Sequence, residues 1–131
     1  MRLNYYLKKI QYLIFKKKFN YPKTVIDYFN NNRKVTIISF SSIGRGRKYI
    51  QLNEFFNLTK KYNVMFVKDI TRSWLNNIDI SYIKSSLKKE NNYAIGFSMG
   101  AFNAIIFSTL HPIKKVIAFS PQFSIHPKIS K

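Results

Sequence analysis

The residues best suited to chemistry lie at Gly96–Gly100, which reads G-x-S-x-G with Ser98 at its centre. A short apolar run at 93–95 precedes this pentapeptide and a stretch of mostly small residues at 101–110 follows it, which predicts a strand, a sharp turn and a helix. Gly96 and Gly100 are needed where the end of the strand and the start of the helix nearly touch. We therefore predict that Ser98 is a nucleophile whose hydroxyl projects from the sheet edge. The alternative is an ordinary turn that carries a serine.

The elements that must position this serine alternate along the chain. Four β-rich runs are separated by helical stretches of about a dozen residues, which predicts a mostly parallel sheet with right-handed crossovers. The expected strands are 35–40, 63–68, 93–97 and 115–119, and the expected helices are 48–61, 78–89 and 99–110. We expect an α/β fold with about four to six strands and flanking helices, in one domain over residues 21–131.

The first 20 residues predict a separate basic amphipathic helix. Apolar residues recur at spacings of three and four, and most of the lysines lie off that face. Such a helix either covers an exposed edge of the sheet, which we favour, or makes peripheral contact with an anionic membrane. Lys8 and Lys9 interrupt the apolar stretch, so the segment does not fit a signal peptide. We expect a cytoplasmic protein.

Composition narrows the function classes. Hydrophobic residues make up 46% of the 131, which indicates a folded domain, and the absence of cysteine excludes disulfides. Two histidines without any cysteine are too few for a zinc site, and we expect no metal and no cofactor. The formal charge of +18 suits a nucleic acid, an anionic membrane surface or a polyanionic substrate. The lysines are spread along the chain, however, and we interpret the charge as compositional bias with no specific nucleic-acid partner.

Several segments together resemble the α/β-hydrolase family. Residues 96–101, the His111–Pro112 turn and Ser120–Pro121 resemble the nucleophile elbow, its helix and the next strand of that family. Residues 35–44 resemble the strand and loop that supply half of its oxyanion hole, and residues 64–74 resemble the next strand and loop. The resemblance leaves out the N-terminal segment.

Two longer phrases are similar to a bacterial branch of hydrolase-fold proteins. They span residues 68–74 and 118–122. Members of that branch are often associated with surface-polysaccharide loci.

The resemblance also implies roles for individual residues. Ser98 matches the nucleophile and the backbone N–H of Met99 matches one oxyanion donor. The N–H of Ser42, or less well that of Ile43, matches the other. Such donors stabilise the tetrahedral intermediate of acyl transfer by about 3 kcal/mol each. The family's usual loop has His-Gly, and this chain departs from it with Phe40–Ser41.

The other half of a catalytic triad is missing from the sequence. In this family the order is Ser, then Asp or Glu, then His, but the last carboxylate here is Glu90. His111 lies in the turn at the far end of the elbow helix. His126 follows the last predicted strand and is the better placed candidate base, although no carboxylate would orient it. Asp69 is a conceivable displaced acid, but its place just after a strand fits a structural role better.

Three functions stay open on these grounds. The first is a serine esterase or transacylase acting on a small ester or an acylated sugar, with its base supplied from outside these residues. The second is an inactive hydrolase-fold partner in surface-polysaccharide processes. The third is a basic module that binds nucleic acid or anionic membrane.

The simplest interpretation of the incomplete triad is the front half of a longer α/β-hydrolase. We expect such a chain to be inactive as these 131 residues. Its last predicted strand would be an exposed edge at 116–120, which predicts oligomerisation.

Overall fold

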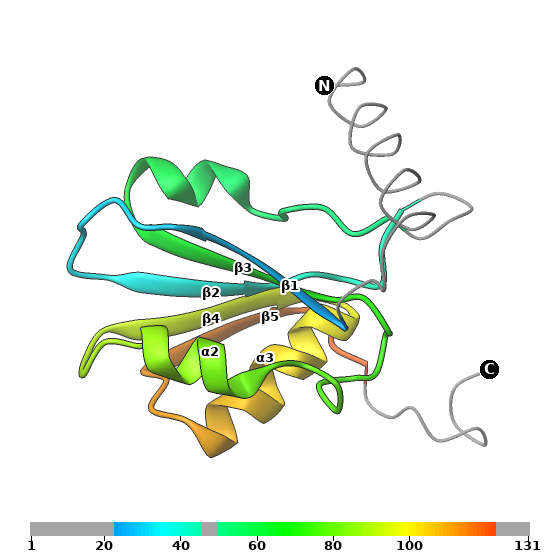
Figure 1. Ribbon diagram of the computed structural model, residues 1–131. Coiled ribbons are helices and arrows are strands. Elements are labelled where there is room, and N and C mark those ends of the chain that lie inside the picture. The colour runs from blue at the N-terminus through cyan, green and yellow to red at the C-terminus, as the bar shows by residue number, and fades with distance from the viewer. Residues whose placement is uncertain (1–22, 46–49, 123–131) are drawn as a thin grey trace.

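One five-stranded sheet organises the computed structural model, which describes residues 23–45 and 50–122 (Figure 1). The predicted amphipathic helix over 1–20 and the candidate base His126 lie outside these residues. The strands are β1 (Thr24–Phe29), β2 (Thr36–Phe40), β3 (Asn63–Asp69), β4 (Asn92–Phe97) and β5 (Lys115–Phe119). The helices are η1 (Phe56–Lys60, a 3-10 helix), α2 (Ile80–Ser86) and α3 (Met99–Leu110).

The sheet is mostly parallel, as the sequence predicts. Its order is β1-β3-β2-β4-β5, and only β1 runs antiparallel, against β3. β2 therefore lies between β3 and β4, with Phe40 paired to Gly96 at the carboxyl ends of the two strands. Because parallel strands end at the same edge, the loop after β2 and the turn after β4 meet there.

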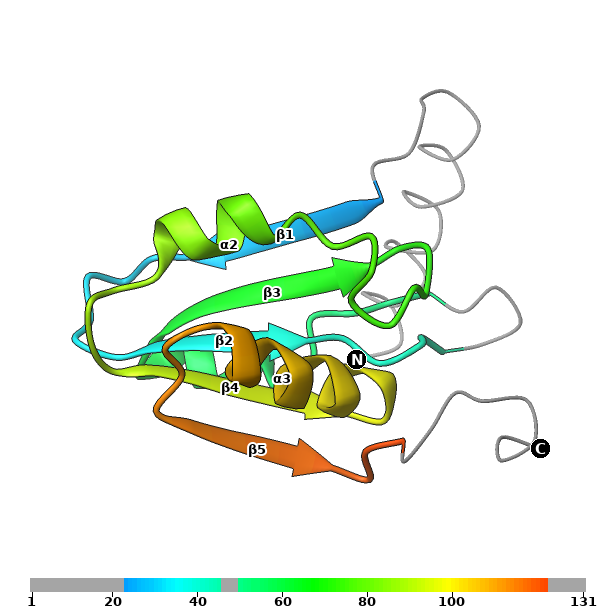
Figure 2. The ribbon, with the colours of Figure 1, turned by 90° about the horizontal axis from the view of Figure 1, so that it is seen from below.

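The core lies on the face of the sheet that α2 and α3 cover (Figure 2). The side chains are aliphatic or aromatic, and Phe40 of β2 packs against Phe107 of α3 with ring centroids 5.4 Å apart. Burial of such side chains contributes about 25 cal/mol per Å² of apolar surface, which makes this face the main source of stability. The fully buried members include Ile38, Phe40, Met65, Ala104 and Phe107.

The opposite face is covered unevenly. η1 and the segment before it lie over this side of the sheet (Figure 1), while Ile117 and Phe119 of β5 remain 55% and 47% exposed. Within the described residues β5 pairs on one side only, with β4. The predicted edge at 116–120 is therefore an edge strand in the structure.

The predicted helix over 48–61 is wrong over most of its described length. Only η1 is helical, and residues 50–54 instead run beside the end of β2. The Ser41 hydroxyl donates to the Leu52 carbonyl at 3.0 Å, and the Ser39 hydroxyl donates to the Glu54 carbonyl at 3.0 Å. These carbonyls are thereby used by serine side chains of β2 and its loop rather than by a helical ladder.

One further helix and one strand differ from what the sequence predicts. The helix predicted over 78–89 is shorter because Asp79 caps its start and Leu87 is extended at its end. Strand β1 was not predicted, since its side chains are only partly buried and a carboxylate, Asp27, interrupts the apolar pattern. Asp27 is accommodated by an ion pair with Lys68 of β3, at 2.6 Å.

Candidate active site

Ser98 forms the turn between β4 and α3 and has an unusual backbone conformation. Its φ and ψ are 54° and −120°, a region that residues with a Cβ rarely occupy. Hydrogen bonds hold the turn on both sides. The Ser98 N–H donates to the Phe119 carbonyl of β5 at 2.9 Å, and the Phe102 N–H of α3 donates to the Ser98 carbonyl at 3.1 Å. The surrounding structure therefore imposes the strained turn.

The two glycines of the pentapeptide are required by close backbone approaches. A Cβ added at Gly96 would lie 2.2 Å from the carbonyl of Gly100, where β4 touches the start of α3. A Cβ added at Gly100 would lie 2.1 Å from the carbonyl oxygen of Phe40, at the end of β2. The predicted near-contact of strand and helix is confirmed. In addition, Gly100 lets α3 lie against the end of β2 and the loop that follows it.

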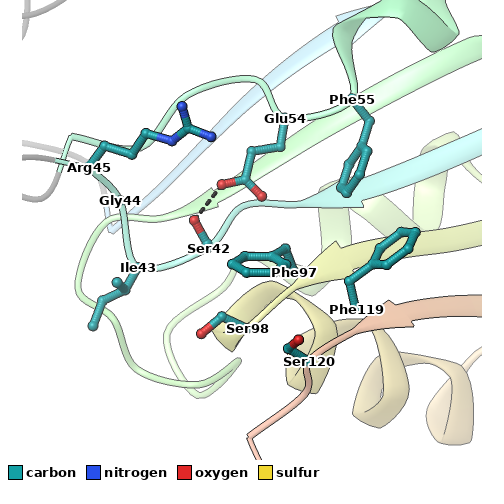
Figure 3. A pocket seen from close by; sticks show the side chains of 10 residues that line it. All are labelled: Ser42, Ile43, Gly44, Arg45, Glu54, Phe55, Phe97, Ser98, Phe119 and Ser120. Atoms are coloured by element: carbon teal, nitrogen blue, oxygen red, sulfur yellow. Dashed lines mark hydrogen bonds between the residues drawn. The ribbon is translucent and has the colours of Figure 1, made fainter.

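A pocket of about 580 Å³ opens at this edge of the sheet, with the half-buried Ser98 on its wall (Figure 3). Aromatic side chains form much of the wall, and the rings of Phe55 and Phe119 stack with centroids 5.7 Å apart. Arg45 and Glu54 are the charged members of the lining. The full set is Ser42, Ile43, Gly44, Arg45, Glu54, Phe55, Phe97, Ser98, Phe119 and Ser120. The pocket offers three serine hydroxyls, an apolar wall, a guanidinium group and a carboxyl group.

The residues predicted to donate to an oxyanion lie beside Ser98. Met99 is the first residue of α3, where a backbone N–H has no acceptor within the helix. Ser42 and Ile43 line the same pocket as Ser98. Free amides at a helix start favour negative charge, so the arrangement suits a developing oxyanion.

The loop that carries Ser42 is fixed by its neighbours. The Ser41 N–H donates to the Val67 carbonyl of β3 at 2.9 Å, and the Gln51 amide nitrogen donates to the Ser42 carbonyl at 2.8 Å. The Ser42 hydroxyl donates to a carboxyl oxygen of Glu54. The backbone beside the pocket is thus held in place from two directions.

Sequence reasoning missed Glu54 as a pocket residue. Burial raises the pKa of its carboxyl above the usual 4.5, while hydrogen bonds from the Ser42 side chain and backbone and the charge of Arg45 lower it. The one signal for its placement was the serine-rich end of β2, but residues 48–61 were expected to be helical, and this hid the contact.

The other sequence candidates lie away from the pocket. The buried Asp69 accepts hydrogen bonds from the Ser73 N–H at 2.8 Å and the Thr71 hydroxyl at 3.1 Å, so its carboxylate holds the turn after β3. His111 follows the C-terminal end of α3, at the opposite end of the helix from Ser98. Its ring packs on Phe107, and burial lowers its pKa. Among the described pocket residues there is neither a histidine nor an aspartate.

The described ranges contain neither a cluster of metal-binding side chains nor a helix that could span a membrane. In residues 23–45 and 50–122 no group of three His, Cys, Asp or Glu side chains is arranged to hold a metal ion. Over the same ranges no helix has the length and apolar character needed to span a bilayer.

Comparison with known proteins identifies a fold relative. No protein-family model and no curated protein matches the sequence. Three solved structures of a capsule O-acetyltransferase of Neisseria meningitidis serogroup A match the fold. The chain is similar in fold to half of that enzyme. The structure with caged gadolinium has a TM-score of 0.61 and 19% identity, over 79% of this chain and 51% of that chain.

Two other structures of the same enzyme agree. One matches with a TM-score of 0.59 and 18% identity, and a mutant in complex with CoA matches with a TM-score of 0.54 and 20% identity. Each match covers 79% of this chain and 50% of the other. The chain therefore spans about half the length of the structures it matches, and identities this low show the fold alone.

Proposed function

We propose that this chain is an α/β-hydrolase-type acyl-transfer protein in which Ser98 carries the acyl group. The observation that supports this most strongly is the Ser98 turn, with its φ of 54° and its place on the pocket wall. A strained turn is kept where the surrounding structure compensates for it, and such turns cluster at active sites. The fold shared with a capsule O-acetyltransferase supports the same chemistry.

The proposed reaction has two steps. The Ser98 hydroxyl oxygen attacks the carbonyl carbon of the acyl donor, its proton passes to a base, and the carbonyl oxygen becomes an oxyanion facing the N–H groups of Met99 and Ser42. Collapse of this intermediate breaks the bond to the leaving group, which takes the proton. An acceptor hydroxyl, or water, then attacks the acyl-serine by the same steps and frees Ser98.

The base is the group that the pocket lacks in the described residues. His126, which lies outside them, stays a predicted base. The alternative is a base supplied by another polypeptide, which would accept the proton in the same step. The chain spans about half of the structures it matches, so we propose that residues 23–122 correspond to the nucleophile-bearing half of such an enzyme.

The substrates follow from the same comparison. We propose a hydroxyl of a surface polysaccharide or an acylated sugar as the acceptor, because the fold relative is a capsule O-acetyltransferase. One matched structure contains CoA, which makes an acyl thioester a candidate donor beside a small ester.

A fluorophosphonate probe tests the nucleophile. Folded protein is incubated with the probe, and the modified peptide is identified by mass spectrometry. We expect labelling at Ser98 that disappears in Ser98→Ala. Ser120→Ala is the matched control because Ser120 lines the same pocket, and labelling should persist in it. Equal labelling of Ser98→Ala would reject the assignment.

The second candidate is an inactive hydrolase-fold partner in surface-polysaccharide processes. It is favoured by the lack of a histidine and an aspartate among the described pocket residues. Folded protein that resists the probe over a range of pH, while it retains its fold, would support this function in place of acyl transfer.

A further inference from the structure

Glu54 lies on the far side of the pocket from Ser98 and is aimed at Ser42 (Figure 3). One carboxyl oxygen accepts the hydrogen bond of the Ser42 hydroxyl. The Ser42 backbone amide also lowers the pKa of this carboxyl. The second oxygen, Oε2, is buried and has no hydrogen-bond partner in the part of the chain that the structure describes. The carboxyl is therefore removed from water while only part of its bonding capacity is used.

The Ser42 amide cannot serve two anions equally well. It is the second donor proposed for the oxyanion at Ser98, and a backbone N–H supplies one donor. A carboxylate is a strong acceptor for that N–H, and its charge also repels a second negative charge built nearby in a partly buried site. A neutral carboxyl group removes the repulsion and competes only weakly for the amide.

We propose that Glu54 is a positioning residue of the acyl-transfer site. As a carboxylate it accepts from the Ser42 hydroxyl and attracts the Ser42 amide, and only in its protonated form does it leave that amide to the oxyanion. This inference rests on the proposed function of Ser98. Glu54 itself does not exchange atoms with the substrate. It determines whether the Ser42 N–H is available to the oxyanion of the substrate.

The surroundings favour the protonated form over a wider pH range than in water. Burial is the largest effect and raises the pKa of Glu54. The charged group facing it from the loop after β2 is Arg45, which lowers the pKa. On the pocket wall, β4, β5 and the Ser98 turn present Phe97, Phe119, Ser98 and Ser120, and none of these side chains is charged.

The first test compares rates of fluorophosphonate labelling at Ser98 between pH 4 and pH 8. Glu54→Gln keeps the size of the side chain and removes its charge. It should label faster than wild type at pH 8, by about tenfold or more, because loss of one oxyanion donor costs roughly 100-fold or more in rate. The two rates should converge at low pH, where wild-type Glu54 is protonated.

Two other variants sharpen this test. Glu90→Gln is the matched control, since Glu90 is exposed and lies outside the pocket lining, and it should behave as wild type. Ser42→Ala removes a hydrogen bond that lowers the pKa of Glu54. The decline in labelling should therefore begin at a higher pH than in wild type.

The second test does not need a reactive serine. In a pH titration followed by NMR, the Ser42 amide proton and the Glu54 carboxyl carbon should shift with one midpoint, above 4.5. The Ser42 amide should lose that shift in Glu54→Gln. If the probe labels Ser98 in neither wild type nor any variant, the proposed function fails. The titration still shows whether the Ser42 amide responds to ionisation of Glu54.

Clear outcomes would overturn the inference. Ser98 labelling in Glu54→Gln with the wild-type rate and pH dependence, or with a lower rate, contradicts it. So does an Ser42 amide that is insensitive to Glu54 ionisation. Thermal melting at pH 7 checks the fold. A folded pKa above the unfolded value means that stability is lost as pH rises through the folded pKa, so Glu54→Gln should melt no lower than wild type.

Discussion

The chemistry proposed for Ser98 depends on close backbone contacts at Gly96 and Gly100, where there is no room for a side chain. Gly96 lets β4 approach the first turn of α3, and Gly100 lets α3 approach the end of β2. The second contact has the wider consequence, because it brings the amide of Met99 and the loop of Ser42 to one pocket. At the residue scale, the site therefore depends on glycine at positions 96 and 100 as much as on the Ser98 hydroxyl.

Gly100→Ala should therefore be strongly destabilising. The new Cβ would meet the Phe40 carbonyl oxygen at 2.1 Å, and that oxygen belongs to a central strand of the sheet. Overpacking against backbone is expected to cost about 3 kcal/mol or more in the free energy of unfolding, measured by urea denaturation.

A control for this prediction lies on the same helix. Thr109→Ala changes an exposed residue near the end of α3 and should alter the free energy of unfolding by less than about 0.5 kcal/mol. Similar stability of the two variants would show that α3 is free to move away from β2.

At the scale of elements, β5 is the strand whose apolar surface is left partly uncovered. It pairs with β4 alone in the described residues, and its outward apolar side chains are half-exposed. A second hollow of about 330 Å³ lies beside it, with Ile117 on its wall together with Ile95 of β4 and Leu58 of η1. An edge strand with such a surface pairs readily with another chain. We propose that oligomers form through 116–120.

Ile117→Lys should weaken this association. A lysine on an edge strand opposes pairing because it adds charge to the surface that a partner would cover. Sedimentation velocity should show concentration-dependent oligomers of wild type and a shift toward monomer in the variant.

Leu110→Lys is the control for added charge, since Leu110 is 64% exposed but lies at the end of α3. It should associate as wild type does. Monomeric wild-type protein at high concentration would contradict the proposed edge contact.

At the scale of the whole molecule, charge opposes compactness. The chain carries 23 basic residues against 5 acidic ones, and a salt bridge within the described residues joins Lys68 to Asp27. Most positive charges therefore act on one another through solvent. Self-repulsion of this kind destabilises the compact state and is screened by salt.

The melting temperature should rise between 0.05 and 0.5 M NaCl at pH 7, since the added salt shortens the screening length to about 5 Å or less. Differential scanning fluorimetry measures this directly. The same series near pH 10 is the control, because the net charge is small close to the pI of 10.2 and the salt effect should shrink. A melting temperature that is independent of salt at pH 7 would mean that the charges are too far apart to repel.

Local sequence patterns determined much of the molecule. Four strand positions follow from apolar, β-branched runs such as Val64–Val67, and the turn at Ser98 follows from its two glycines, because these signals depend on neighbours in the chain. The predicted roles of His126 and of the first 20 residues stay predictions.

Only the tertiary structure decided where Glu54 and β1 lie. Glu54 reaches the pocket because serines at the end of β2 bind the carbonyls of residues 52 and 54, a contact between segments that no local periodicity records. β1 is stable as a strand because β3 supplies its hydrogen bonds and Lys68 pairs with Asp27. Patterns along the chain report which face of an element is apolar, but they do not report which distant segment will satisfy a buried polar group.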